Sequence, residues 1–407
     1  MKAFFHVMQI DSLLEIKREF QPVGTEKVDL LQALDRVLAG DFQAGQDIPG
    51  FDRATMDGYA VKAASTFGAS EGNPAYLTVV GTVTMGQVPA FSVEMGQAAR
   101  IATGGMLPPG ADSVVMIEHT DALDDTTIEV YRSIAPGQHT VARDEDAARG
   151  QVLVEGGCRL RAQELGILAA CGARRVEVFR RPRVGIISTG DEVIPVDEPP
   201  RPGQVRDVNR YTLSALVLQA GGEPHFFGIV RDDPQALAAA CRQALQDTDM
   251  VLISGGSSVG TRDLTVEVLE KLPESRIMAH GVSIRPGKPT ILARCGGKPF
   301  WGLPGHVTSA MVVFMVLVRP FLSWIGGCAD SPPVTLRACL SRNIASAQGR
   351  VDFVRVRLIP KNGQILAEPV LGGSGLMRTM VAADGLVAVD LNSEGLEQGT
   401  VVQVMLF

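Results

Sequence analysis

The sequence predicts a multidomain protein of α/β plus β class, built around a central, mostly parallel α/β sheet domain. Its 407 residues exceed the about 250 to 300 residues at which a single hydrophobic core stops growing. From Arg183 onward, short apolar runs alternate with helical segments. On both sides of that region, short β-like runs are separated by Gly, Pro and Asp. These patterns indicate a sheet domain accompanied by two smaller β units.

The composition is typical of a globular protein, because 45% of the residues are hydrophobic, 20% charged and 5% aromatic. The net charge of −7 argues against a sequence-independent grip on nucleic acid, which needs an excess of Lys and Arg. The most apolar stretch, 310–318, is shorter than the about 20 residues that span a membrane, so we expect a buried helix. The N-terminal residues lack a cleavage-like site, so we expect no secretory signal and a cytoplasmic protein.

The cysteines are scattered along the chain without a C-x-x-C motif or a nearby His pair. This spacing predicts neither a zinc site nor a disulfide framework. We therefore expect thiols that pack in hydrophobic cores.

The first part of the chain combines helical and β-like patterns. Apolar residues recur at helical spacing over 11–20 and 29–38, and again over 162–170. Between them, short β-like runs predict an inserted all-β unit with strands over 76–80, 98–102, 113–117 and 127–131.

The central region reads as repeated strand–helix units. Strands are predicted over 183–189, 223–230, 250–254, 289–293 and 298–303, and the continuous apolar runs 183–189 and 250–254 are expected to be buried on both faces. Helices are predicted over 209–219, 232–245, 263–272 and 306–325. Such alternation implies a mostly parallel sheet. Beyond Gly327, strand-like runs over 334–340, 351–359, 363–370, 385–390 and 400–407 predict a separate small β domain or barrel.

Three of the predicted strands end in unusual loops. They are Gly190-Asp191-Glu192, the run from Gly255 to Asp263, and Pro304-Gly305-His306. In an open α/β sheet, ligands bind outside the carboxyl ends of the strands. The backbone N–H groups and hydroxyls of GGSSVG suit a phosphate at a helix N-terminus. One such loop is equally a glycine-rich turn, but three on neighbouring strands favour a shared anion site.

Charged residues lie near these loops. Arg285-Pro286-Gly287-Lys288-Pro289 offers a guanidinium fork and an ammonium to an oxyanion, although the same turn could be solvated surface. The acidic candidates could hold Mg²⁺ beside a phosphate or exchange protons, although each alone is more often a turn or cap residue. His306 is either a polar residue next to a helix start or a ligand contact. The acidic candidates are Asp57, Asp146, Asp191, Glu192, Asp232, Asp233 and Asp263.

Seven strings spread over most of the chain carry a further signal. The strings are PGFDRATMDGYAV (49–61), ATGGMLPPGADSVVMIE (102–118), STGDEV (188–193), RDDP (231–234), SGGSSVGTRD (254–263), RPGKP (285–289) and GLPG (302–305). Taken together and in this order, they resemble the molybdopterin molybdenumtransferase family, which contains the bacterial MoeA proteins and the matching domain of gephyrin.

The resemblance implies Mg²⁺-dependent insertion of molybdate into adenylylated molybdopterin, with release of AMP. It implies an elongated linking domain (1–46 and 142–176), an inserted β domain with MDGYA (47–141), a molybdopterin-binding α/β domain (177–327) and a C-terminal β domain (328–407). It also implies a homodimer whose cleft is shared between protomers. Transient contacts with the molybdopterin adenylyltransferase and with apo-molybdoenzymes are expected, and contacts with nucleic acid or membrane are not.

Matching the family's motifs residue by residue assigns candidate roles. The catalytic candidates are Asp57, Glu192, Asp232, Asp263 and Lys288, and the metal ligands among them are Glu192, Asp232 and Asp263. Asp146 and Ser374 fall near two further family positions. The candidates for binding the cofactor are Thr189, Gly190, Asp191, Gly255, Gly256, Ser257, Ser258, Gly260, Arg285, Gly287, Pro304, Gly305, His306 and Ser374.

The chain departs from the family pattern at a few of these places. His306 and Val307 replace a usual Asn and Pro, and Arg285 stands where Lys is frequent. Ser257 replaces Val, and Thr261-Arg262 precedes the acid of its loop. The more cationic pocket leaves open whether the oxyanion is molybdate or tungstate. Adenylyl transfer to molybdopterin and a non-catalytic pterin-binding scaffold are the other functions that the sequence allows.

Overall fold

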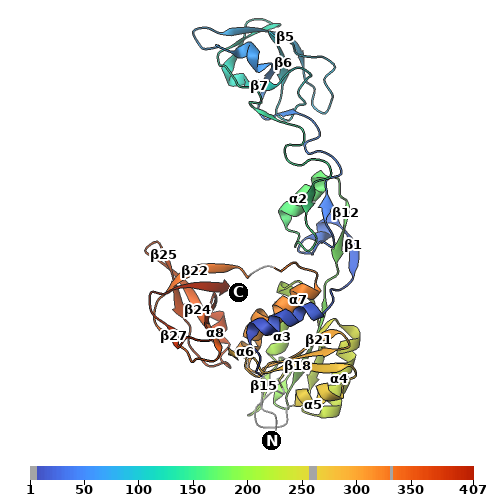
Figure 1. The fold of residues 1–407 in the computed structure, drawn as a ribbon, viewed down its shortest axis with the longest axis vertical. Coiled ribbons are helices and arrows are strands. Elements are labelled where there is room, and N and C mark those ends of the chain that lie inside the picture. The colour runs from blue at the N-terminus through green and yellow to red at the C-terminus, as the bar shows by residue number, and fades with distance from the viewer. Residues whose placement is uncertain (1–6, 256–263, 331–332) are drawn as a thin grey trace.

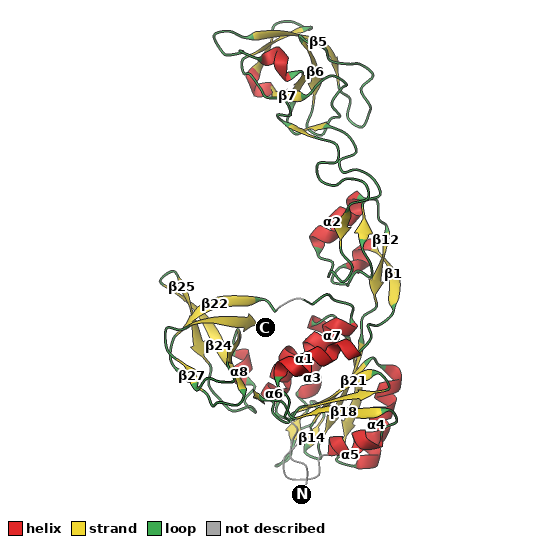
Figure 2. Cartoon of the chain, in the orientation of Figure 1, coloured by secondary structure: helices red, strands yellow, loops and turns green. Residues whose placement is uncertain are grey.

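The structure, a computed structural model, describes residues 7–255, 264–330 and 333–407. It shows an elongated molecule with four parts (Figures 1 and 2). An inserted β domain occupies one end, and a narrow linking region joins it to a central α/β domain at the other end. The C-terminal β barrel lies beside the α/β domain.

The central domain contains a six-stranded sheet in the order β16-β13-β17-β21-β20-β18. The first four strands are parallel to one another, and β20 pairs antiparallel with β21 on one side and β18 on the other. This arrangement confirms the predicted mostly parallel sheet. The edge strand β18 was not predicted. The strands are β13 (Arg183–Thr189), β16 (Glu223–Val230), β17 (Met250–Ser254), β18 (Ser275–His280), β20 (Ile291–Cys295) and β21 (Lys298–Leu303).

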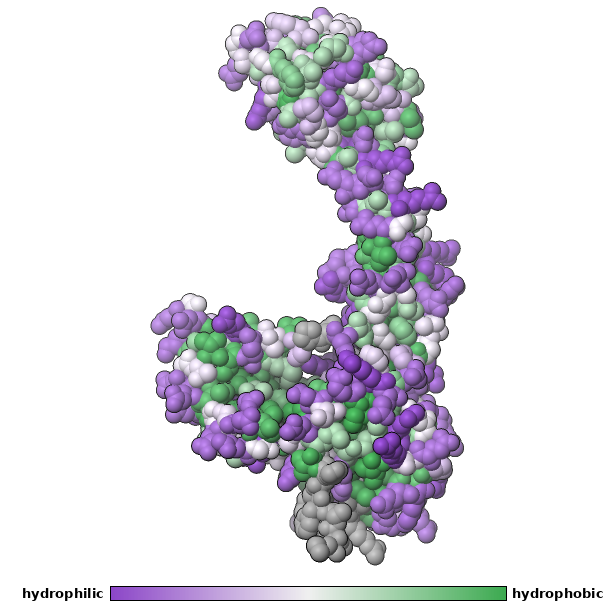
Figure 3. All heavy atoms as spheres, in the orientation of Figure 1, coloured by the Kyte–Doolittle hydropathy of each residue, from purple (hydrophilic) through white to green (hydrophobic). Residues whose placement is uncertain are grey.

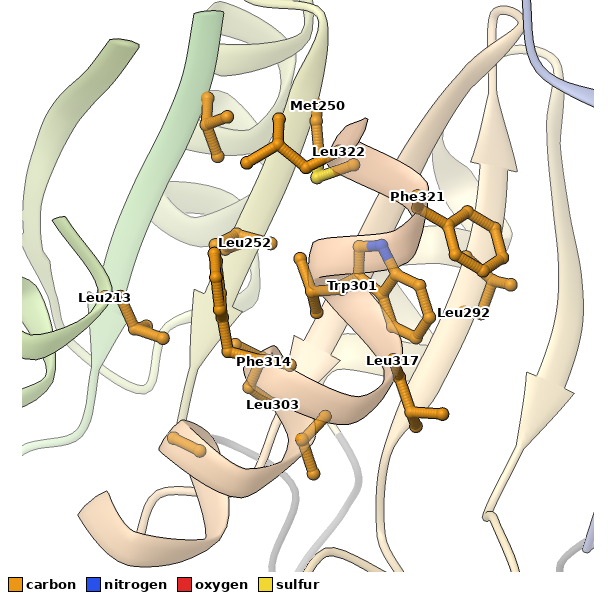
Figure 4. Close-up of a cluster of buried hydrophobic side chains, with 14 of the residues drawn as sticks. Leu213, Met250, Leu252, Leu292, Trp301, Leu303, Phe314, Leu317, Phe321 and Leu322 are labelled. Carbon is orange, nitrogen blue, oxygen red and sulfur yellow. The ribbon is translucent and has the colours of Figure 1, made fainter. Parts of the chain in front are cut away.

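Helices cover both faces of this sheet. One hydrophobic cluster lies under α4 and α5, and another lies under α1, α3, α6 and α7. In the second cluster, Trp301 packs edge-on against Phe321 with ring centroids 5.0 Å apart (Figure 4). The helices are α1 (Ile10–Glu15), α3 (Asn209–Gln219), α4 (Pro234–Asp247), α5 (Leu264–Lys271), α6 (Val307–Val313) and α7 (Arg319–Ile325).

A single π-helical turn, η5 (Phe314–Val318), joins α6 to α7 into one continuous helix. Within the described ranges, this is the one helix long and apolar enough to cross a membrane by length and composition. Phe314, Leu317 and Phe321 on it are fully buried in the core of the α/β domain. Core packing accounts for its apolar sequence, as predicted.

The linking region is built from β1 (Thr25–Asp29) paired with β12 (Arg175–Phe179), from α2 (Ala162–Ala170), and from β2 (Phe42–Gln43) paired with β11 (Val152–Val154). The predicted helix over 29–38 is wrong. Residues Leu30–Ala33 form only a 3₁₀ turn, η2, and Leu31 is 84% exposed. Val37 and Leu38 instead bridge to distant segments, so tertiary pairing overrides the local helical pattern.

The N-terminal helical pattern is confirmed. Helix α1 continues into the 3₁₀ helix η1 (Ile16–Glu19), and Leu13 and Phe20 are buried in the core of the α/β domain. The indole N–H of Trp324 donates to the carbonyl of Phe20 at 2.9 Å. Residues 10–20 therefore lie on the α/β domain, before the chain enters the linking region.

The inserted domain is the predicted all-β unit. Its six-stranded sheet has the order β7-β4-β6-β5-β9-β8, and the short pair β3 (Arg53–Ala54) and β10 (Thr140–Val141) lies at its base. Two 3₁₀ turns, η3 (Ala63–Thr66) and η4 (Ile117–His119), join strands. The strands are β4 (Gly58–Val61), β5 (Ala75–Thr82), β6 (Gln97–Ile101), β7 (Ser113–Met116), β8 (Thr120–Ala122) and β9 (Thr127–Val130).

The C-terminal part is the predicted barrel. It closes because β24 pairs with both β25 and β26. Strand β19 (Ile284–Arg285), which belongs to the cationic turn, adds to this sheet beside β24. The barrel therefore holds that turn in place through backbone pairing between β19 and β24. Its elements are β22 (Thr335–Leu340), β23 (Ile344–Ala345), β24 (Val351–Lys361), β25 (Gln364–Pro369), α8 (Arg378–Val381), β26 (Gly385–Val389), β27 (Gly395–Leu396) and β28 (Val401–Leu406). A further short pair joins β14 (Val193–Ile194) to β15 (Val205–Arg206).

Candidate functional site

An open cleft of about 1010 Å³ lies at the carboxyl ends of the parallel strands. The loops after β13, β17 and β21 all contribute to its walls, so the three loops singled out in the sequence meet at one place. The lining residues are Ser188, Thr189, Glu192, Val193, Pro200, Val205, Arg206, Asp207, Val208, Asn209, Ser254, Gly255, Pro289, Pro304, Gly305, His306, Val307 and Gly375.

The loops touch one another through their backbones. Gly255 has φ +108°, and a Cβ placed on it would lie 2.2 Å from the carbonyl oxygen of Thr189. A Cβ on Gly305 would lie 3.6 Å from the Cα of Gly255. Glycine at 255 therefore allows the β13 and β17 loops to close on each other, which no larger residue permits.

Acidic side chains gather around the end of β13. The Thr189 hydroxyl donates to Oδ1 of Asp232 at 3.0 Å, and the backbone N–H of Asp232 lies 3.4 Å from Oδ1 of Asp191. Gly190, with φ +145°, leaves room for the carboxylate of Glu192, because a Cβ there would lie 2.7 Å from Oε2. The structure thus brings Thr189, Gly190, Asp191, Glu192 and Asp232 together.

Part of the predicted site falls outside the described residues. The residues concerned are Gly256, Ser257, Ser258, Gly260 and Asp263. Within 7–255, 264–330 and 333–407, no group of three or more His, Cys, Asp or Glu side chains is placed to hold a metal ion. The predicted metal site therefore stays a prediction, since its third ligand, Asp263, is not described.

The cationic turn is fixed by the C-terminal barrel. Oδ2 of Asp352 lies 3.4 Å from Nη1 of Arg285, and its Oδ1 accepts from Nε of Arg350 at 2.8 Å. The Asp352 carboxylate therefore lies between two guanidinium groups. Asp352 is only 3% exposed, and a carboxylate buried to this degree needs such positively charged partners. Gly287 packs directly against Val313, where a Cβ would lie 2.4 Å from a methyl group. The same turn carries Lys288, and its last residue, Pro289, lines the cleft.

The barrel also reaches the third loop. Nδ1 of His306 lies 2.9 Å from the hydroxyl of Ser374, and the N–H of Thr308 donates to the carbonyl of Ser374 at 3.2 Å. Arg355 supports this segment by donating to the carbonyl of Gly372 at 2.6 Å. Burial lowers the pKa of the Arg355 guanidinium. His306 and Ser374, predicted from distant motifs, are therefore neighbours at the mouth of the cleft.

Two residues that line the cleft are not among the site residues predicted from the sequence. Asp207 and Asn209 line it and are 4% and 9% exposed. Oδ1 of Asp207 accepts from the N–H of Arg210 at 3.0 Å, and Nδ2 of Asn209 donates to the carbonyl of Gly305 at 2.8 Å. The signal that could have found both is their position, since Asp207 lies just before the predicted helix 209–219 and Asn209 is its first residue.

Asp57 lies far from this cleft in the single chain. It belongs to the inserted domain, at the opposite end of the molecule from β15 (Figure 1). Its Oδ1 accepts from the N–H of Thr103 at 2.7 Å, and this backbone hydrogen bond keeps the pKa of the Asp57 carboxyl below its ordinary value. Asp57 is thus held as a carboxylate on an exposed surface. Thr103, after Asp207 and Asn209, is a third residue to which the sequence analysis assigns no role.

Comparison with protein families matches three models in chain order. Residues 8–172 match the MoeA N-terminal region (domain I and II), residues 185–324 match a probable molybdopterin binding domain, and residues 337–407 match the MoeA C-terminal region (domain IV).

Individual proteins match over similar lengths. A molybdopterin molybdenumtransferase of Bacillus subtilis is 33% identical over 98% of this chain and 93% of its own length. One from a Nostoc species is 39% identical over 75% of this chain and 70% of its own length. The crystal structure of a molybdopterin biosynthesis MoeA protein from Pyrococcus horikoshii OT3 aligns with a TM-score of 0.85 at 32% identity, covering 98% of this chain and 100% of that one.

Proposed function

Since this chain belongs to the molybdopterin molybdenumtransferase (MoeA) family and is a transferase of molybdenum cofactor biosynthesis, we propose that it inserts molybdate into adenylylated molybdopterin in a Mg²⁺-dependent reaction that releases AMP. One observation carries the proposal. Residues of three strand-end loops and Pro289, the last residue of the turn 285–289, line a single cleft, which is large enough for an extended nucleotide–pterin conjugate.

The charges around the cleft suit the two halves of this chemistry. Molybdate is a dianion, and the guanidinium of Arg285 and the ammonium of Lys288 suit its binding. Each oxo group that leaves as water must gain two protons, which requires proton donors near the metal oxyanion. Glu192 after β13, Asp232 beside Thr189, and His306 after β21 are groups able to hold and transfer such protons.

The carboxylates at this edge fit a hard cation. Mg²⁺ prefers carboxylate, phosphate and water oxygens, and Glu192 and Asp232 offer carboxylate oxygens beside the cleft. We propose that these two residues, with Asp263, hold Mg²⁺. The ion supplies charge neutralisation at the pyrophosphate from which AMP departs.

We further propose that the protein acts as a cytoplasmic homodimer whose cleft is completed by the partner's inserted domain. The support is the location of Asp57, which the fold of one chain leaves at the far end of the molecule. The inserted domain also exposes apolar side chains that a partner would cover, including Phe67, Met85 and Val88. Figure 3 shows hydrophobic residues mixed with hydrophilic ones on the visible face of this domain. Brief contacts with the adenylyltransferase that supplies the substrate and with apo-molybdoenzymes that receive the product follow from the same proposal.

A reconstituted reaction tests the proposal. Purified protein is given adenylylated molybdopterin, Mg²⁺ and either molybdate or tungstate, and AMP and metal-loaded pterin are measured. We expect AMP release that depends on an oxyanion and falls strongly in Glu192→Gln. Asp197→Asn, an exposed loop residue near Glu192, serves as the matched control and should leave the rate unchanged. Absence of AMP with both oxyanions would contradict insertion.

A further inference from the structure

Two buried hydrogen-bond acceptors in the wall of the cleft have no partner. Oδ2 of Asp207 and Oδ1 of Asn209 are shielded from solvent and accept no hydrogen bond from any described residue. Both side chains line the cleft. Buried polar atoms in folded proteins are nearly always paired, so two unpaired acceptors in one cleft wall point to donors that a ligand supplies.

These acceptors are held in place by their other contacts. The N–H of Asp207 donates to the carbonyl of Ile194 at 2.9 Å, in line with the β14–β15 pairing. Its Oδ1 is engaged by the N–H of Arg210 at 3.0 Å. The amide nitrogen of Asn209 is engaged by Gly305, which leaves the amide oxygen as the remaining acceptor. The backbone around both residues is therefore preorganised by the fold rather than by a ligand.

The chemistry of the acceptors selects the part of the substrate that binds there. An oxyanion or a phosphate offers no N–H donor and would be repelled by the Asp207 carboxylate. Adenine offers one amino group next to an acceptor nitrogen. The 2-amino-4-oxopyrimidine edge of a pterin, in contrast, presents the 2-amino group beside N3–H, which are two adjacent donors for two acceptors.

We propose that Asp207 and Asn209 recognise the pterin ring through its 2-amino and N3–H donors. The hydroxyl of Ser188, which is also buried without a partner and lines the cleft, supplies a donor for the 4-oxo group. This inference rests on the proposed function and deepens it, because it separates a pterin subsite at 207–209 from the cationic turn at 285–289. Asp207 and Asn209 are binding residues in this scheme, and take no part in proton transfer.

Binding of simple pteridines tests the proposal without turnover. Pterin and lumazine have the same bicyclic frame, but lumazine carries an oxo group in place of the 2-amino group. Calorimetry or fluorescence titration should show that the wild-type protein binds pterin at least about tenfold more tightly than lumazine, as expected for a hydrogen bond to a charged acceptor. Asp207→Asn should lose this preference, and Asp197→Asn should keep it.

The variants are chosen so that a loss of binding is not mistaken for a loss of folding. Asp207→Asn retains an oxygen for the N–H of Arg210, and Asp207→Ser, another good helix cap, serves if the first variant does not fold. Equal affinity of the wild-type protein for the two probes, or no binding of either, would overturn the proposal. Loss of AMP release is measured separately. A protein that prefers pterin but releases no AMP would contradict insertion and leave the pterin subsite standing.

Discussion

Gly255 sets the closest backbone approach in the cleft. A Cβ at this position would lie 2.2 Å from the carbonyl oxygen of Thr189, and the φ of +108° is itself unfavourable for other residues. We expect Gly255→Ala to push the β13 and β17 loops apart and to lower the free energy of unfolding by about 2 to 3 kcal/mol, which lowers the melting temperature. We also expect it to reduce AMP release at least about tenfold. Differential scanning fluorimetry and the reconstituted reaction measure the two effects.

A second glycine provides the control for this variant. Gly166 lies within α2, has no positive φ, and would present an added Cβ to open space. Gly166→Ala should therefore keep full activity and raise stability by up to about 1 kcal/mol, since alanine favours helices. Normal activity in Gly255→Ala would show that the loop contact is not needed for the reaction.

The residues of the cleft differ in how far the sequence reveals them. Glu192, Gly255, Pro304 and His306 follow directly after buried strands, and that position alone predicts that they meet. Asp207 gives no such signal. It joins the cleft because the β14–β15 pairing folds the loop after β13 back over the strand ends, and a pairing between such short segments has no sequence pattern of its own.

At the scale of elements, the Arg180–Asp249 ion pair ties the end of β12 to the start of β17. The guanidinium of Arg180 donates to both carboxylate oxygens, at 2.6 and 2.5 Å, and the N–H of Arg183 donates at 2.8 Å. Burial alone would raise the pKa of Asp249, but these hydrogen bonds outweigh burial and lower it. The pair therefore fastens the linking region to the sheet.

Removing this ion pair should lower the free energy of unfolding by an amount that depends on pH. Asp249→Asn is expected to lower the free energy of unfolding by about 2 kcal/mol near pH 7, a moderate value because Arg180 is partly exposed. Since the folded pKa is depressed, the wild-type advantage is full above the ordinary Asp pKa and shrinks as the pH falls below about 4. Urea unfolding at pH 7, 5 and 3.5 measures it. The exposed Asp247→Asn is the control, and a difference that grows toward low pH would contradict the assignment.

The prediction of helices and strands succeeded where the apolar pattern of a segment by itself indicates how that segment is buried. The strands 183–189 and 250–254 occur with the predicted bounds, because a strand covered on both faces needs a continuous apolar run. The segment 29–38 misled because its leucines have helical spacing but do not share a buried face: Leu31 and Leu34 are exposed while Leu38 is buried. Edge strand β18, SRIMAH, is neither continuously apolar nor cleanly alternating, so it gave no signal.

At the scale of the whole molecule, the C-terminal barrel supports the anion side of the cleft. Asp352 on β24 lies between Arg285 and Arg350, and β19 pairs with β24. We expect Asp352→Asn to loosen Arg285 and to raise the KM for molybdate about three- to tenfold with a smaller change in kcat. Steady-state AMP release at varied molybdate measures both constants. A lower kcat at unchanged KM would contradict a positioning role.

The proposed shared cleft makes a prediction that only an assembly of two chains can fulfil. Asp57→Asn keeps an oxygen for the N–H of Thr103 but loses the charge. Asp263→Asn changes a residue that the proposal assigns to the wall formed by the other chain's α/β domain. Each variant alone should release little AMP. Mixed in equal amounts and allowed to exchange subunits, they should recover about a quarter of wild-type activity, because half of the dimers are mixed and each mixed dimer holds one intact cleft. Glu192→Gln mixed with Asp232→Asn changes the same wall in both chains and should recover nothing. Failure of the first pair to recover, with exchange verified by mass spectrometry, would mean that Asp57 does not act across the subunit boundary.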